Sequence, residues 1–433
     1  MNDVAMGITG ILILLILFLT GIELAFAMAL IGFIGYAYLT TFSAACNLVA
    51  KDFFDTFTSY TLTVIPLFVL MGQIAYHSGT AKRIYASAHK LVGQVPGGLA
   101  MTTVVGATLF KAMCGSTLAT TATFSSLAVP EMRRHGYSKQ LSTGIVASVG
   151  TLGVIFPPSI TLIIFGIIAE QSIGELFLAG IVPGLLVSFL FLVVIYGWVK
   201  INPSIAPRGE NFSWKEKVRS MPELLWVALI FLVVMGGLMN GFFTPTEAGT
   251  IGTLAVLLLA FARERIPLKK LITSSDESLR TGCMVLTLLA GSSVLGHFLA
   301  ITEIPMMAAD WAAGLPLHRN LIMVLIMLIY LIGGSFIDDL AFMILATPIF
   351  FPVVTKLGYD PIWFGVIIGI TVMIGAIIPP VAMCVFVVKN ITGEDFGVIY
   401  SGVYPFLLSL VACAVVLFIF PQVATFLPRI FAH

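Results

Sequence analysis

Long apolar stretches constrain this sequence more than any other feature. A helix that crosses a bilayer needs about 20 mostly apolar residues, and stretches that could cross, or enter and return, recur along the whole chain. They lie at about 4–20, 22–42, 58–77, 94–130, 140–169, 176–199, 222–241, 244–262, 281–302, 320–352, 361–388 and 396–428. Because backbone in lipid must satisfy its own hydrogen bonds, such runs predict an all-α polytopic membrane protein. A β-barrel would instead show alternating segments of about 10 residues.

The composition excludes most other classes of protein. Hydrophobic residues make up 59% of the chain and charged residues 10%, whereas soluble domains carry about 25% charged residues. Disordered proteins, nucleic-acid partners and ordinary soluble enzymes are therefore excluded, and the net charge of +1 suggests no polyanionic ligand. The five cysteines occur singly, without the paired spacing of a zinc site or a disulfide framework.

The distribution of Lys and Arg predicts the orientation. Seventeen basic residues, Arg208 among them, fall on one set of connections; the other set holds four, which are Lys51, Arg319, Lys356 and Arg429. The richer side should be cytoplasmic. Both termini are then predicted to be periplasmic.

The sequence contains an internal repeat with an offset of 222 residues. Pro157-Pro158 corresponds to Pro379-Pro380, and the Gly-Tyr pairs 136–137 and 358–359 each lie 21 residues before them. The first Gly-Tyr turn lies on the basic side and the second on the poor side, so the two halves should enter the membrane from opposite faces. We expect a first repeat at 1–199, a cytoplasmic linker at 200–221 and a second repeat at 222–433. Inverted repeats of this kind are typical of secondary transporters.

Each repeat should contain a broken helix, at about 140–169 and 361–388. The paired prolines remove backbone donors, and the carbonyls one turn earlier then need other partners. A kink repaired by Ser or Thr hydroxyls or by water is one interpretation. The matching positions in two inverted repeats favour the other, a bound Na⁺ ion.

Before each broken helix lies a stretch that is too long for one crossing and too short for two. Small and polar residues occupy its centre, at 113–122 in the first repeat and at 333–339 in the second. A helix followed by a re-entrant hairpin fits this pattern, with the hairpins at about 103–130 and 332–352. Their tips would expose helix-end amides and carbonyls, which suit an anion and a cation respectively.

Two capping-box patterns and one histidine complete the polar features that we interpret from the sequence. Thr20 with Glu23, and Thr244 with Glu247, have the spacing that opens a helix. His297 lies in an apolar stretch, and we expect a packed side chain rather than a proton relay.

Several of these motifs resemble one known family. They are Ile65 to Gly72, the Ala-x-x-Gly-Ser-Thr-x-Ala-Thr run from Ala112, Gly150 to Ser159, and Ile377 to Pro380. They resemble motifs of the large membrane subunit of tripartite ATP-independent periplasmic (TRAP) transporters, and the similarity covers essentially the whole chain. The resemblance implies an elevator-type fold in a bacterial inner membrane and Na⁺-driven uptake of an organic acid. It also implies two partners, a periplasmic substrate-binding protein and a small four-helix membrane subunit, here expected as a separate chain.

The same resemblance implies two Na⁺ sites. The first lies between the first hairpin tip and the first broken helix, and the second lies between their counterparts. The residues implied are Cys114, Thr117, Gly150, Gly153 and Pro157 for the first site, and Gly334, Asp338, Thr371, Met373 and Gly375 for the second. Cys114 replaces the Ser that the family commonly has, and Asp338-Asp339 replaces a single Asp, which leaves the role of Asp339 open.

Lys111 is the only basic residue within an apolar stretch, four residues before Gly115 at the first tip. An intramembrane cation points to function, so we expect Lys111, Ser116, Thr117 and Asp338 to bind the carboxylate substrate. Alternatively, Lys111 extends to the cytoplasmic surface or pairs with an acid such as Asp338. A stand-alone Na⁺/dicarboxylate symporter, a channel and an intramembrane enzyme built on the two aspartates remain alternatives for the whole chain.

Overall fold

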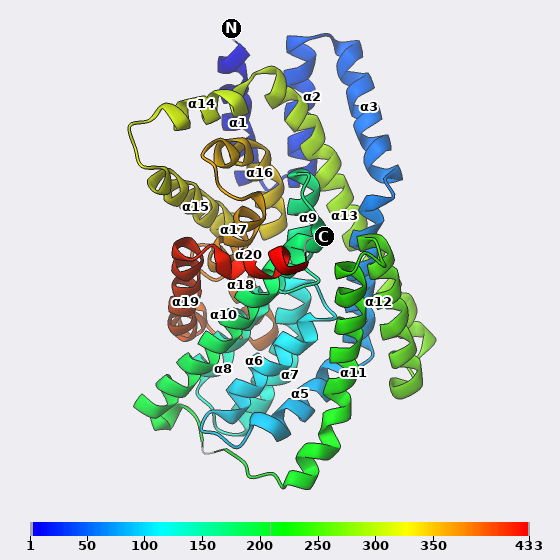
Figure 1. Cartoon of the computed structure of the whole chain (residues 1–433), viewed down its shortest axis with the longest axis vertical. Helices are drawn as coiled ribbons and strands as arrows, with labels where there is room; N and C mark the ends of the chain where they lie inside the picture. Colours follow the sequence, from blue (N-terminus) through cyan, green and yellow to red (C-terminus); the bar gives the residue numbers. More distant parts are fainter. Residues whose placement is uncertain (1–2, 208, 432–433) are drawn as a thin grey trace.

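The computed structural model describes residues 3–207 and 209–431, so Arg208 lies outside the described residues. All regular secondary structure within these ranges is helical (Figure 1). Seven helices are long and apolar enough to cross a membrane, and an eighth span arises if two bent segments are counted together. The predicted all-α polytopic membrane fold is confirmed.

The first half of the chain contains two helices that the apolar stretches do not predict. The helix at Phe42–Thr58 bends by 57° into the segment that follows it, and the helix at Thr80–Val92 is amphipathic. Both carry charges that lower their mean hydropathy. The helices here are α1 (Asp3–Leu19), α2 (Leu24–Leu39), α3 (Phe42–Thr58), α4 (Val64–His77), α5 (Thr80–Val92), α6 (Gly98–Lys111), α7 (Thr117–Arg134), α8 (Lys139–Gly150), α9 (Ile160–Ile168) and α10 (Ile173–Ile201), with short 3₁₀ turns at Thr61–Thr63, Thr151–Val154 and Pro203–Ile205.

The second half ends in a separate short helix rather than one long one, because Pro421 interrupts the predicted stretch 396–428. Its helices are α11 (Trp214–Met239), α12 (Pro245–Leu259), a π-helical turn (Ala260–Glu264), α13 (Leu268–Ile301), α14 (Ile304–Gly314), α15 (Arg319–Phe336), α16 (Asp339–Lys356), α17 (Pro361–Gly375), α18 (Met383–Thr392), α19 (Phe396–Ile419) and α20 (Gln422–Phe431).

One of the two predicted capping boxes is confirmed. Thr244 accepts a hydrogen bond from the Glu247 backbone, and the Glu247 carboxylate accepts one from the Thr244 backbone in return. The other prediction is wrong. Glu23 is itself the N-cap residue of α2, without a side-chain capping bond, and the Thr20 hydroxyl donates to the Leu17 carbonyl instead. A turn at 20–23 shifts the helix start three residues beyond the predicted position.

The helices of the two proposed repeats begin at matching positions. Helix α7 begins at Thr117 and α16 at Asp339, while α8 begins at Lys139 and α17 at Pro361; both offsets are 222. The packing is also reciprocal, because α7 packs on α18 while α16 packs on α9. These observations agree with two interlocked repeats. The boundaries 1–199, 200–221 and 222–433 stay a prediction.

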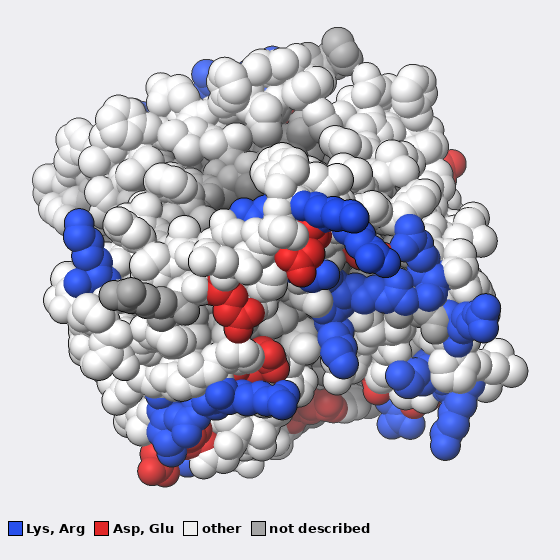
Figure 2. All heavy atoms as spheres, turned by 90° about the horizontal axis from the view of Figure 1, so that it is seen from below, with Lys and Arg blue, Asp and Glu red and all other residues white. Residues whose placement is uncertain are grey.

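Basic side chains gather at one end of the molecule. Figure 2 shows Lys and Arg concentrated on the end seen from below, where the connection between α10 and α11 lies in Figure 1. The chain begins at the opposite end, whereas α20 packs on α10 about half-way between the two ends (Figure 1). The prediction that both termini are periplasmic remains a prediction.

The connection between α10 and α11 is tied to the base of the α6–α7 pair. The Gln94 side chain donates to the Phe212 carbonyl (2.8 Å) and accepts from Lys217 Nζ (2.7 Å). Nearby, the Ser138 backbone donates to the Ile205 carbonyl (2.9 Å). The predicted linker is therefore held against the helices that carry the first hairpin.

Candidate functional site

The first hairpin is formed by α6 and α7, which pack together and meet at Ala112–Ser116. Helix α6 has 14 residues, so its length of about 21 Å is less than the thickness of the hydrocarbon core. Ser116 caps α7, and its Oγ accepts from the Ala119 backbone (3.2 Å). The tip thus lies inside the protein, at the residues predicted for it.

Lys111 ends α6 and is fully buried. Its Nζ donates to the Ser116 carbonyl at 2.9 Å, which fixes the ammonium group across the tip. A methyl group built on Gly153 would collide with this Nζ and lie 3.1 Å from the Thr117 backbone nitrogen. The alternative in which Lys111 extends to the cytoplasmic surface is therefore wrong.

The first helix break faces this tip. Helix α8 ends at Gly150, a 3₁₀ turn covers Thr151–Val154, and α9 begins at Ile160 after the cis pair Pro157-Pro158. A methyl group on Gly115 would lie 2.6 Å from the Pro158 carbonyl oxygen, so the tip packs directly on the break. Of the residues assigned to the first Na⁺ site, Thr117 and Gly153 lie together here.

Cys114 and Gly150 make other contacts. The Cys114 side chain packs against Gly72 on α4, with its Sγ 3.0 Å from a methyl group built on that glycine. Gly150 packs against the Thr121 hydroxyl, which lies one turn into α7 and whose Oγ1 lies 3.6 Å from Cys384 Sγ on α18. Thr121 and Cys384 belong to this polar interior, although the sequence analysis did not select them.

The carbonyls at the two breaks have different partners. Pro157 offers no N–H to Gly153 one turn earlier, and the Gly153 carbonyl accepts no hydrogen bond from the described part of the chain. The Val154 carbonyl, which loses its donor to Pro158, accepts from the Ser159 hydroxyl instead. At the second break the Gly375 carbonyl accepts from Ile378 and the Ala376 carbonyl from Cys384. The first break therefore fits a cation better than the second.

The second hairpin is formed by α15 and α16, whose tip is Ile337–Asp338. Both helices have 18 residues and are long enough to count as spans. Asp338 is the N-cap residue of α16 and forms no capping bond with its side chain, whereas Asp339 is buried. Asp339 Oδ1 accepts from the Leu340 backbone (3.0 Å), and its Oδ2 accepts from Thr117 Oγ1 at 3.5 Å. The two hairpin tips thus meet through Asp339 rather than Asp338.

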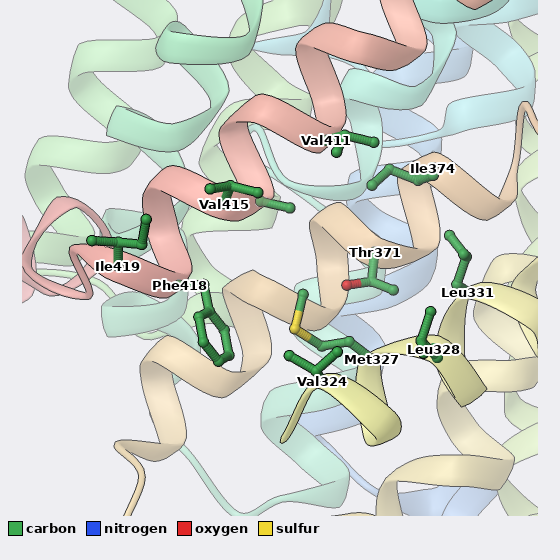
Figure 3. Close-up of a pocket in the computed structure, with 11 residues that line it drawn as sticks. Val324, Met327, Leu328, Leu331, Thr371, Ile374, Val411, Val415, Phe418 and Ile419 are labelled. Atoms are coloured by element: carbon green, nitrogen blue, oxygen red, sulfur yellow. The ribbon is translucent and has the colours of Figure 1, made fainter. Parts of the chain in front are cut away.

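The remaining residues of the second predicted Na⁺ set fall in two places. Gly334 and Gly375 approach closely, because a methyl group on Gly375 would lie 2.8 Å from the Gly334 carbonyl carbon. Met373 is buried. Thr371 Oγ1 donates to the Ile367 carbonyl (2.8 Å), and Figure 3 places its side chain in an apolar groove among residues of α15 and α19. Its hydroxyl is therefore engaged away from the hairpin tip.

Acidic and metal-binding side chains do not cluster at either break. In the described ranges, no group of three or more His, Cys, Asp or Glu side chains is placed to hold a metal ion. A cation at the breaks would have to be bound mostly by carbonyl and hydroxyl oxygens. His297, which the sequence predicts to be packed, is 53% exposed in its side chain and lies 3.5 Å from Asp52 on α3.

Comparison with known proteins identifies the family. Residues 11–423 match the family model described as the tripartite ATP-independent periplasmic transporter, DctM component. The chain belongs to this family. It is 34% identical over 382 residues to the C4-dicarboxylate TRAP transporter large permease protein of Pseudomonas aeruginosa, covering 88% of this chain and 89% of that protein.

Other relatives of this TRAP large permease are named for different substrates. The sialic acid TRAP transporter large permease protein of Vibrio cholerae is 32% identical, covering 92% of this chain and 93% of the relative. The isethionate TRAP transporter permease protein DctMQ of Oleidesulfovibrio alaskensis is 31% identical over 91% of this chain but 62% of the longer relative. These relatives are transporter permeases rather than enzymes.

Solved structures show the same fold at low sequence identity. The Alcanivorax borkumensis YdaH transporter matches with a TM-score of 0.64 at 14% identity, over 88% of this chain and 89% of that chain. Neisseria gonorrhoeae MtrF matches with a TM-score of 0.56 at 15% identity, over 87% and 84% of the two chains. The TRAP large permease therefore shares its overall helical arrangement with known membrane transporters.

Proposed function

We propose that this TRAP large permease imports an organic acid by a Na⁺-coupled elevator motion in a bacterial inner membrane. The acid would be a C4-dicarboxylate, sialic acid or a similar carboxylate, since relatives carry such substrates in their names. A periplasmic substrate-binding protein would deliver it, and a small four-helix membrane subunit would complete the transporter. The observation that carries this proposal is the meeting of the two hairpin tips through Thr117 and Asp339.

The substrate site is proposed at these tips. Lys111 supplies a buried positive charge, and the cost of burying it is repaid when a carboxylate pairs with it. Ser116 and Thr117 supply hydroxyl groups at the start of α7, where the helix dipole favours an anion. Because Nζ of Lys111 is bound to the Ser116 carbonyl, substrate entry requires this contact to exchange. Asp338, half-buried on the opposite tip, would contribute its backbone or a hydrogen bond to a substrate hydroxyl.

The first Na⁺ is proposed between the tip and the break, at the Gly153 carbonyl, with Thr117 and the backbone of Cys114, Gly150 and Pro157 around it. Carbonyl and hydroxyl oxygens are the hard donors that a small alkali cation takes up in place of water. A second ion is proposed between Gly334, Gly375, Met373 and the Asp338 tip. Thr371 would contribute there through its backbone, since its hydroxyl is bonded to Ile367.

Transport by reconstituted protein tests the proposal. Proteoliposomes holding this chain and its small partner should take up the acid only with the binding protein outside and Na⁺ in excess outside. Replacement of external Na⁺ by choline should abolish uptake. Uptake without Na⁺ would contradict the coupling, and equal uptake without binding protein would favour the stand-alone Na⁺/dicarboxylate symporter instead.

A further inference from the structure

An apolar groove opens on the surface between α15, α17 and α19, with a volume of about 360 Å³. Its side chains point toward a common space in Figure 3 and carry no charge. They are Val324, Met327, Leu328, Leu331, Thr371, Ile374, Val411, Ala414, Val415, Phe418 and Ile419. Leu328 and Val415 are 46% and 50% exposed, so the groove is open to whatever surrounds the protein.

One end of the groove leads to a positive charge. Phe418, which lines the groove, lies 6.2 Å from the Trp363 ring, and Trp363 stacks on Tyr359 at 5.1 Å. The Arg319 guanidinium lies over the Tyr359 ring at 5.3 Å. Arg319 begins α15, and Ile419 ends α19. The groove therefore begins near the ends of these two helices, at Val324 on α15 and Ile419 on α19, and extends inward along them.

The chemistry of this end suits the head-group region. Trp363 is buried inside the protein and only links the groove to Tyr359. Tyr359 is half-buried, and Tyr concentrates where hydrocarbon meets water. The exposed Arg319 beside it lies in the first turn of α15, where the helix dipole adds attraction for an anion. A guanidinium group stacked on a ring keeps its in-plane N–H donors available for phosphate oxygens. The groove beyond it offers only hydrocarbon contact, because the Thr371 hydroxyl is already bonded within its own helix.

We propose that this groove binds a phospholipid with an anionic head group. One acyl chain lies in the groove between α15, α17 and α19, and the phosphate group lies against Arg319. The positive charge at one end suits a phosphate group, and the apolar lining along the rest suits an acyl chain. A small organic acid has no hydrocarbon chain to bury in this groove, so the combination favours a lipid. The groove borders the proposed second Na⁺ site, because Thr371 lines it, but the lipid contacts proposed here do not depend on the proposed function.

Lipid titration of the purified full chain tests this site. The protein in a mild detergent is titrated with phosphatidylglycerol or phosphatidylcholine, and bound lipid is measured by native mass spectrometry. Arg319→Gln should weaken phosphatidylglycerol binding about tenfold or more, because a charge-assisted hydrogen bond is lost. Leu328→Trp should fill the groove and reduce binding of both lipids. Arg280→Gln is the matched control, since its side chain is 78% exposed on α13, and it should leave binding unchanged.

The outcomes separate the alternatives. Unchanged phosphatidylglycerol binding in Arg319→Gln would overturn the head-group contact, and unchanged binding in Leu328→Trp would overturn the groove as the site. Val415→Trp serves as a second filling variant if Leu328→Trp fails to fold by size-exclusion chromatography. Loss of the small membrane subunit from either filling variant, with lipid binding intact, would show that a protein helix occupies the groove and would also overturn the proposal.

Discussion

Thr117 Oγ1 donates to Asp339 Oδ2 across 3.5 Å, although 222 residues separate the two in the sequence. This separation equals the repeat offset that relates Pro157-Pro158 to Pro379-Pro380. Two positions equivalent under a two-fold rotation can touch only close to its axis. If the repeats are related as proposed, the hairpin tips therefore meet at the pseudo-two-fold axis, the region where transporters with inverted repeats bind their substrates.

Replacement of Lys111 by Met should remove the positive charge at this point. We expect the apparent affinity for the transported acid to fall roughly 10- to 150-fold, the loss of one charge-assisted hydrogen bond. Uptake into proteoliposomes at varied acid concentration measures this. Lys111→Arg should retain part of the activity, because it keeps charge but changes shape. Lys82→Met, on the exposed face of α5, is the control. Parental transport by correctly inserted Lys111→Met would remove this lysine from the substrate site.

The two adjacent aspartates should differ in their importance. Asp339 contacts Thr117. Asp338 is the half-buried N-cap residue of α16, but its side chain forms no capping hydrogen bond. Asp339→Asn should therefore lower uptake more strongly than Asp338→Asn, and Thr117→Val combined with Asp339→Asn should cost less than the sum of the single changes. Initial uptake rates of the parent, Thr117→Val, Asp339→Asn and the double variant measure this coupling, and Asp338→Asn is compared with Asp339→Asn in the same assay. A larger loss of uptake in Asp338→Asn would instead support the sequence-based prediction that Asp338 binds the substrate.

A methyl group at Gly153 should disturb the first ion site. Gly153→Ala would collide with Lys111 Nζ and crowd the Thr117 backbone. We expect the Na⁺ concentration for half-maximal uptake to rise roughly tenfold, because losing one polar contact to a charged group has an effect of about this size. Gly236→Ala on α11 is the control, because nothing in the described residues beyond its own turn of helix lies within 4 Å of the added methyl group. An unchanged Na⁺ dependence of active Gly153→Ala would argue against an ion at this break.

Reporter fusions should reveal the orientation. Alkaline phosphatase attached after His433 should be active and a fluorescent protein there should be dark, because the distribution of basic residues predicts that both termini are periplasmic. A fusion within residues 203–207 should give the opposite pattern. An active cytoplasmic reporter at the C-terminus would contradict both the orientation and the inverted entry of the two halves.

Proline chemistry and charge made the helix breaks predictable from the sequence. The two breaks fall within the predicted ranges 140–169 and 361–388, and α7 and α16 begin within the predicted polar centres 113–122 and 333–339. The sequence left the position of Lys111 open between the site and the cytoplasmic surface, because it does not give the depth of the hairpin; in the structure the side chain is buried. Amphipathic helices α3 and α5 were missed because their charges hide them from a search for apolar stretches.

Side-chain direction was harder to predict than helix position. Asp338 and Asp339 are neighbours, and only the rotation of α16 decides which of them meets Thr117. Thr371 illustrates the same point, since its hydroxyl bonds the Ile367 carbonyl within α17 and not the hairpin tip. The offset of 222 did contain the signal for Asp339, because it pairs that residue with Thr117 directly.

The hydrogen bonds from Gln94 to Phe212 and Lys217 connect the two halves of the chain on the basic side. If the first hairpin travels relative to α11, these bonds must either break in every transport cycle or move the chain at 202–213 with them. Fully extended, about 12 residues reach roughly 40 Å, so the covalent length does not limit such travel. Breaking these hydrogen bonds would then limit the rate at which the hairpin leaves its resting position, and not the distance that it travels.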